Sequence, residues 1–383
     1  MSNDTQPEIR FPGFTEAWEQ RKLGEVVESV GTGRSTFTNG IVQTSETPYA
    51  VLGSTSVISY DSMFDHSGDF ILTARVGANA GNLYKYFGEV KISDNTVYIQ
   101  ANNLDFIYYL LTKYDLKRLS FGTGQPLVKA SEVKNLKLNF PQKNEEQQKI
   151  GSFFKQLDDT IALHQRKLDL LKETKKGFLQ KMFPKNGAKV PEVRLPGFTG
   201  DWEQRKAKEL FIPKAEKNQP ELPVLSVTQD HGVVYREQVG IDIKYDKATL
   251  KNYKVIHQGD FVISLRSFQG GFELSDKLGI TSPAYTIFVP KSMDSQDNLF
   301  WKTKFKTFTF IESLKTVTFG IRDGKSISFS EFGDLKLFFP KNIEEQQKIG
   351  NFFKQLDDTI ALHQRKLDLL KETKKGFLQK MFV

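Results

Sequence analysis

EEQQKIGSFFKQLDDTIALHQRKLDLLKETKKGFLQKMF, residues 145–183, decides the fold, because it recurs at residues 344–382 with one difference, Ser152 against Asn351. The segment contains no Pro, and its composition favours an α-helix throughout. Steps of four and three residues alternate along it, as in a coiled-coil seam. The seam is Ile150, Phe154, Leu157, Ile161, His164, Leu168, Leu171, Lys175, Phe178 and Met182. Such a helix needs a partner, and the second copy is the obvious one.

The flanks of the seam predict how the two helices begin and pair. Four further apolar residues are expected to widen the apolar face, namely Phe153, Leu163, Leu170 and Leu179. The Glu pair at the start of each copy suits the positive end of a helix dipole. We expect antiparallel pairing, because each helix follows a similar globular half and the link between the halves is short. A parallel pair would require the second half to return along the whole helix.

The repeat extends beyond the helices. RFPGFTEAWEQRK at residues 10–22 is matched by RLPGFTGDWEQRK at 194–206, and GDFILTAR at 68–75 by GDFVISLR at 259–266. The chain is therefore a tandem duplication. Between the like segments the two halves differ strongly. This pattern indicates that the like segments meet a common partner twice, whereas the unlike segments each meet something different.

The dissimilar stretches, near residues 30–140 and 212–340, are typical of short strands, because β-branched and aromatic residues alternate with polar ones between turn-forming residues. Residues 104–118 and, more weakly, 297–313 have helical spacing. The predicted fold class is α+β, with two mixed α/β domains separated by two long antiparallel helices in a pseudo-two-fold arrangement. The predicted boundaries are a first domain at 1–144, a helix at 145–183, a linker at 184–193, a second domain at 194–343 and a helix at 344–383.

The bulk composition limits the class of protein. The chain of 383 residues has no Cys, which excludes disulfides and Cys-ligated metal and fits a reducing, cytoplasmic location. No apolar run approaches the ~20 residues of a membrane span, and MSNDTQPEIR at the N-terminus lacks a signal-peptide core, so we expect no membrane partner. The net charge of +8 favours a polyanionic partner, although a solvated coiled-coil surface explains part of it.

In the order of its motifs the chain resembles the specificity subunits of type I restriction–modification systems. The resemblance covers nearly the whole chain and rests on the tandem PGF-x3-WEQRK segments, the P-x3-EEQQKI helix starts, the near-identical helices and the GDF patches. It implies two target-recognition domains, each of which reads one half of a split, asymmetric sequence in double-stranded DNA. It also implies that the repeated helices set the spacing and bind two modification subunits, which carry adenine methylation, and that restriction (translocase and nuclease) subunits join this complex. The residues expected to bind these partners are Glu145, Gln148, Phe178, Glu344, Gln347 and Phe377.

Catalytic signatures are missing, so we expect no catalytic residue, metal or cofactor in this chain. Neither an N-P-P-Y-type tetrapeptide nor the Gly-rich cofactor loop of an adenine methyltransferase is present. GIRDGKS at 320–326 is one residue short of a P-loop, and an alternating segment follows it in place of a helix. The five His lack metal-ligand spacing, and we assign His164 and His363 to the coiled-coil seam.

The candidates for DNA contacts lie in loops rich in hydrogen-bonding groups. Arg75 and Arg266 each end an apolar run and begin a Gly-containing loop, where Arg can bind guanine and Asn or Gln can bind adenine. The alternative is a structural Arg that pairs with Asp69 or Asp260. Other candidate loops, at 122–126, 320–326, 31–35 and 229–232, compete with plain hairpin turns. The full set is Arg34, Arg75, Asn79, Thr123, Gln125, Lys129, Gln229, His231, Arg266, Gln269, Arg322, Lys325 and Ser326.

A second interpretation, from a different functional class of protein, is also consistent with the sequence. The chain could be a coiled-coil scaffold that bridges two partner proteins without binding DNA. A gel shift on mixed-sequence DNA at increasing salt separates the two readings, because contacts to phosphate weaken as the salt concentration rises.

Overall fold

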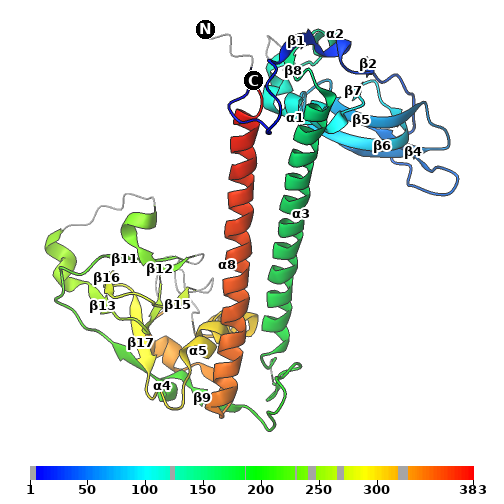
Figure 1. Ribbon diagram of the computed structural model, residues 1–383. Coiled ribbons are helices and arrows are strands. Elements are labelled where there is room, and N and C mark those ends of the chain that lie inside the picture. Colours follow the sequence, from blue (N-terminus) through cyan, green and yellow to red (C-terminus); the bar gives the residue numbers. More distant parts are fainter. Residues whose placement is uncertain are drawn as a thin grey trace. The chain divides into compact units, whose positions relative to one another are not determined.

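The computed structural model describes residues 6–120, 126–185, 187–228, 231–239, 247–264, 271–317 and 327–383. It divides into two compact units, of which the first is the chain up to Arg166 together with Arg365–Val383 and the second is Lys167–Gln364. Each unit contains a globular domain and part of both long helices, α3 (Asn144–Lys181) and α8 (Ile343–Lys380) (Figure 1). The predicted α+β class and the duplicated plan are confirmed.

The first unit is built on a six-stranded sheet in the order β2-β7-β5-β6-β3-β4, in which only β3 and β6 are parallel. A separate antiparallel pair joins β1 to β8. The strands are β1 (Glu19–Lys22), β2 (Ser29–Thr32), β3 (Tyr49–Leu52), β4 (Val57–Asp61), β5 (His66–Ala74), β6 (Leu83–Ile92), β7 (Thr96–Gln100) and β8 (Lys137–Phe140). The helices are η1 (Leu23–Glu25), α1 (Leu104–Tyr114), η2 (Leu116–Ser120) and α2 (Ala130–Lys134).

The sheet of the first unit curls on itself. Gly68 of β5 lies opposite Gly88 of β6, and both have a positive φ, 123° and 113°, which interrupts the regular extended backbone at that level. Beyond this point the end of β6 reaches the segment that follows β2, where the Ser35 N–H donates to the Ile92 carbonyl at 3.2 Å. The ends of several strands therefore meet at one place.

Helix α1 joins the sheet of the first unit to the long helices. Its buried side chains, which include Phe106, Ile107 and Leu110, pack in one cluster with Trp18 and Phe154. The helical spacing predicted this element, but the α-helix ends at Tyr114, because Asp115 takes a left-handed conformation with φ 61°. The 3-10 helix η2 continues the chain from there.

The second unit has shorter sheets. Its main sheet has the order β10-β17-β14-β15, and the antiparallel pairs β11-β12, β13-β16 and β18-β9 accompany it. The strands are β9 (Glu203–Lys206), β10 (Phe211–Lys214), β11 (Leu225–Thr228), β12 (Gly232–Tyr235), β13 (Lys254–Ile256), β14 (Phe261–Ile263), β15 (Phe272–Leu274), β16 (Gly279–Thr281), β17 (Thr286–Pro290) and β18 (Lys336–Phe339). The helices are α4 (Ala207–Leu210), η3 (Arg236–Val239), η4 (Lys247–Asn252), α5 (Asn298–Lys304), α6 (Phe308–Leu314) and α7 (Phe329–Gly333).

The core of the second unit is rich in aromatic rings. Phe261 and Phe288 stack at 5.3 Å between ring centroids, and Trp301 of α5 lies against Phe211 at 5.1 Å. The single helix predicted at 297–313 is two helices, because the Thr307 side chain accepts a hydrogen bond from the Phe310 N–H and so starts α6. Aromatic packing and this cap explain the turn between α5 and α6.

Within each unit the two long helices run antiparallel. In the first unit Phe153 packs on Phe377 at 5.1 Å between ring centroids, and Asp158 forms an ion pair with Lys374. The second unit repeats these contacts, with Phe178 on Phe352 and an ion pair between Lys175 and Asp357. The polar seam position Lys175 therefore has a carboxylate partner on the opposite helix.

The seam is narrower than the sequence indicated. Phe153 and Leu179 contact the cores of their units, but Leu163 and Leu170 are 57% and 67% exposed. The expectation that all four widen the buried face was wrong for these two leucines, because a two-helix contact covers only a narrow stripe. Both helices end at a Lys, and the following Met-Phe pairs are buried, at Met182, Phe183, Met381 and Phe382. No helix in the described part of the chain is both long and apolar enough to cross a bilayer.

Candidate nucleic-acid interface

The ends of three strands of the first unit hold the turn between β6 and β7, from Ser93 to Thr96. The Thr96 N–H donates to the Ser93 carbonyl at 3.1 Å and closes the turn. The Ser93 N–H donates to Leu52 at the end of β3 at 3.0 Å, and the Gly33 N–H, after β2, donates to the Thr96 carbonyl at 3.0 Å. From the end of β5, the Arg75 N–H donates to the Asn95 carbonyl at 2.9 Å. We call these converging strand ends, together with residues 126–129, the rim of the first unit.

The rim includes residues 126–129, whose backbone is bound to the residues at and after the end of β5. The Val128 N–H donates to the Arg75 carbonyl at 2.7 Å, and the Gly77 N–H donates to the Pro126 carbonyl at 3.1 Å. Four predicted DNA-contact residues, Arg34, Arg75, Asn79 and Lys129, therefore lie on segments that hydrogen-bond to one another or to the same turn. Sequence reasoning gave these residues as separate candidates along the chain, and the rim brings their segments together.

The side chains of these four residues are available to a ligand to different degrees. Arg34 is exposed, and Arg75, which is half-buried, places its Nη1 3.4 Å from the Asp94 carbonyl. The Asn79 side chain accepts from Asn82 Nδ2 at 3.1 Å, and Lys129 forms an exposed ion pair with Glu132 at 3.2 Å. Among the described residues, Arg75 forms no ion pair with Asp69, which is exposed.

Sequence reasoning missed the centre of the rim. Asp94 and Asn95 are exposed at the tip of the held turn, and Thr55 is exposed beside Ser54, whose hydroxyl donates to the Asn95 carbonyl at 3.3 Å. The available signal was the run Ser93-Asp94-Asn95 between two strand-like segments, which has the composition of a turn. Nothing local in that run indicates that distant strands hold it.

Eight predicted DNA-contact residues lie outside the described residues: Thr123, Gln125, Gln229, Arg266, Gln269, Arg322, Lys325 and Ser326. His231 is described and exposed, and its N–H donates to the Thr228 hydroxyl at 3.0 Å. Arg266 and Gln269 fall in sequence between β14 and β15, and the described residues on either side are joined by the Ser264 N–H, which donates to the Gly271 carbonyl at 2.9 Å.

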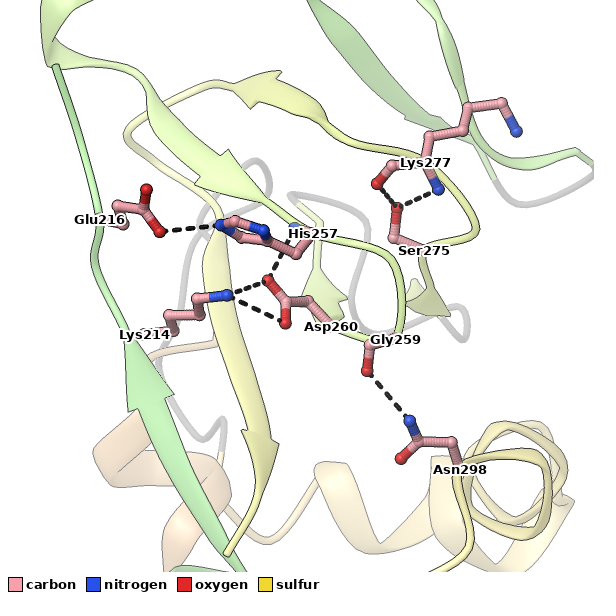
Figure 2. A network of polar contacts seen from close by, with 8 residues as sticks. All are labelled: Lys214, Glu216, His257, Gly259, Asp260, Ser275, Lys277 and Asn298. Carbon is pink, nitrogen blue, oxygen red and sulfur yellow. Dashed lines mark hydrogen bonds and ion pairs between the residues drawn. The ribbon is translucent and has the colours of Figure 1, made fainter. Parts of the chain in front are cut away.

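The GDF motif plays different roles in the two units. Asp260 is 4% exposed, and its carboxylate accepts from Lys214 Nζ at 2.9 Å and from the His257 N–H at 2.8 Å (Figure 2). His257 in turn lies 2.8 Å from Glu216. Asp260 therefore fixes the turn before β14 through Lys214 of β10. Asp69, the matching residue of the first unit, is exposed in the middle of β5. The GDF motif therefore does not make the same contact in the two units.

A polar cleft of about 870 Å³ lies in the second unit, lined by His231, Glu273, Lys302 and Lys306 among others. Burial raises the pKa of Glu273, and Lys306, its ion-pair partner, opposes that rise. Cations and carboxylates both line the cleft, with Asp357 and Lys175 on its helical side. The mixed charge gives the cleft no clear preference for an anion.

The predicted partner-binding residues fall into two groups. Glu145, Gln148, Glu344 and Gln347 are exposed on the first turns of α3 and α8. Phe178 and Phe377 are half-buried, because each packs on a Phe of the opposite helix within its unit. Within the described residues, no group of three or more His, Asp or Glu has the geometry of a metal site.

Known proteins share this sequence pattern and fold. The family profile "Type I restriction modification DNA specificity domain" matches residues 15–173 and again 199–372. Two Methanocaldococcus jannaschii proteins carry the names of the MjaX and MjaVIII type I restriction enzyme specificity subunits. They are 21% and 24% identical over 71% and 79% of this chain. The alignments span 66% of the MjaX protein, just under two thirds, and 75% of the MjaVIII protein.

A solved structure has the same fold. The S subunit of the type I restriction–modification system from M. genitalium superposes with a TM-score of 0.68 and covers 99% of both chains, at 16% sequence identity. Because two copies of the family domain together cover most of its length, the chain belongs to the DNA specificity family of type I restriction–modification systems.

Proposed function

We propose that this chain is the sequence-recognition subunit of a type I restriction–modification complex, and that each unit reads one half of a bipartite, asymmetric site in double-stranded DNA. Membership of the specificity family supports recognition of DNA and gives the scaffold reading no support. The chain itself catalyses no step in this proposal, and the reactions belong to its partner subunits. We propose a cytoplasmic location for the complex, because its proposed DNA target and partner subunits are there.

The rim of the first unit is the observation that carries the proposal. Arg34 and Arg75 supply cations from segments that hydrogen-bond to a turn whose tip is polar, so the same surface can contact phosphate and base edges. The backbone of the turn is held by three strand ends, which keeps the loss of conformational entropy on binding small. In the second unit, we propose that Arg266, Gln269 and His231 have the corresponding role.

The repeated helices are proposed to bind two modification subunits. The exposed residues Glu145 and Gln148 occur again as Glu344 and Gln347, so a partner that recognises one set recognises the other. Phe178 and Phe377 would add apolar contact through the part of each ring that stays exposed. Restriction subunits are proposed to join the complex through the modification subunits.

A domain exchange tests the proposal. Residues 30–140 are replaced by those of a relative, and the sequences methylated in cells that also express a modification subunit are mapped. We expect one half-site to change and the other to stay the same. A change in both halves, or in neither, would refute the assignment of one half-site to each unit.

A further inference from the structure

We propose that Asn95, at the tip of the turn between β6 and β7, reads an adenine in the half-site recognised by the first unit. The inference rests on the proposed function, because it names one base-reading residue of the same surface. The sequence did not single out Asn95. It is selected by how the structure holds its backbone and exposes its side chain.

All four carbonyls of the turn, from Ser93 to Thr96, accept a hydrogen bond. The Asn95 carbonyl accepts from the Arg75 N–H at 2.9 Å and from the Ser54 hydroxyl at 3.3 Å, and the Asp94 carbonyl accepts from Arg75 Nη1 at 3.4 Å. At its base, the Ser93 and Thr96 hydroxyls lie 3.0 Å apart and are buried. A turn held in this way presents its side chains in a fixed direction.

The close approach of another strand end adds to this rigidity. A Cβ on Gly33 would lie 2.1 Å from the Ile92 carbonyl oxygen and 2.3 Å from that of Ser93. Only Gly fits there, so the segment that carries Arg34 packs directly on the backbone of the turn. The position of the tip relative to Arg34 is therefore set by backbone contacts and not by flexible side chains.

The side chains at the tip are exposed and make no hydrogen bond to the described residues. An Asn amide places an N–H donor beside a carbonyl acceptor, the pair that matches N7 and the N6 amino group of adenine in the major groove. The exposed carboxylate of Asp94 would repel phosphate, and it can accept from the exocyclic amino group of a base. The tip is therefore suited to base edges, while Arg34 and Arg75 are suited to the phosphates beside them.

The test selects bound DNA from a randomised duplex library with the full-length chain and with Asn95→Ala, and sequences it. Asn39→Ala is the matched control, because Asn39 is also exposed in the first unit but lies in the segment that contacts β4 through Thr38 and Ile41. We expect Asn95→Ala to lose the preference for adenine at one position of one half-site. The affinity for the original site should fall by about 5- to 150-fold, the range of a bidentate base contact. The thermal midpoint and the salt dependence of binding should not change.

Three other outcomes have distinct meanings. If Asn95→Ala selects the unchanged sequence with unchanged affinity, the tip does not read DNA and the inference is wrong. If all sequences weaken alike, the Asn95 side chain contacts the DNA backbone and not a base, and again the inference is wrong. If the unaltered chain enriches no sequence at all, the proposed function itself fails, which separates that failure from failure of the Asn95 assignment.

Discussion

The guanidinium of Arg10 makes two hydrogen bonds to the carboxylate of Glu146, with Nε–Oε1 and Nη2–Oε2 distances of 2.6 and 2.8 Å. The two side chains are only 11% and 1% exposed. The second unit builds the same pair from Arg194 and Glu345, at 2.8 and 2.9 Å. In each unit the Arg of the PGF segment is thereby tied to the first turn of a long helix.

Replacement of Arg10 by Ala should lower the free energy of unfolding by about 3–5 kcal/mol, because it leaves the Glu146 carboxylate buried without its partner. Chemical denaturation at neutral pH measures the change. Lys129→Ala is the control, since its ion pair with Glu132 is exposed and should contribute less than about 1 kcal/mol. Equal losses in the two variants would show that the buried pair is worth no more than a surface pair.

The two glycines of the repeated helix should respond in opposite ways to alanine. A Cβ on Gly151 would lie 2.7 Å from the Phe106 backbone nitrogen, whereas a Cβ on Gly177 meets no atom within 4 Å. Gly151→Ala should therefore push α1 from α3 and cost about 1–3 kcal/mol of stability. Gly177→Ala should add about 0.5–1 kcal/mol, because alanine favours the helix. Thermal melts of both variants decide the point, and a stabilised Gly151→Ala would contradict the close packing of α1 on α3.

The sequence predicted the elements that depend on local periodicity. The step pattern from Ile150 to Met182 identified the long helix, and the second copy supplied its antiparallel partner. The sequence also predicted that Glu145 and Glu146 suit the helix N-terminus, but it gave no sign that Glu146 is an ion-pair partner. Its arginine lies 136 residues away, and no periodic signal connects them.

The candidate site was predicted as separate loops and not as a surface. Arg34 and Arg75 were found because each stands in or beside a Gly-containing loop, and Lys129 was a further candidate. Their convergence depends on the bend at Gly68 and Gly88, whose positive φ values could not be read from composition. Asn95 was missed for the same reason, since its role follows from contacts with strand ends that are distant in sequence.

The buried Lys304 should make the second unit sensitive to pH. It is 5% exposed, its ammonium lies 5.5 Å from the centre of the Phe183 ring, and burial lowers its pKa from 10.5 to about 8. In the duplicated plan, Lys304 corresponds to Leu110 of the first unit. Lys304 lies four residues after Phe300, and Leu110 lies four residues after the matching Phe106. The folded protein therefore holds a desolvated cation where the first unit holds a leucine.

The sign of the effect follows from proton binding. Between about pH 8 and 10.5 the unfolded chain keeps the Lys304 proton that the folded chain has released, so stability should rise with pH in that window. Lys304→Leu should stabilise the protein at neutral pH, by up to about 3 kcal/mol, and should remove this rise. Denaturation of both proteins at several pH values measures the difference. A constant difference across the window would show that Lys304 titrates normally.

Replacement of Arg75 by Ala should affect DNA binding more than folding. The one hydrogen bond described for the Arg75 side chain is the weak contact of Nη1 with the Asp94 carbonyl at 3.4 Å, whereas the backbone of Arg75 holds the turn whatever its side chain is. The thermal midpoint should therefore stay nearly unchanged while DNA affinity falls. If the guanidinium neutralises a phosphate, the slope of log K against log salt should become shallower by about 0.9, and all sequences should weaken alike. If it binds a base, the loss should be about 1–3 kcal/mol and confined to one position.

Arg21→Ala is the control for charge alone, because Arg21 is exposed on β1 with its guanidinium on the Glu25 carbonyl. A variant that melts much earlier, while its folded fraction binds DNA normally, would show that the Arg75 side chain is structural.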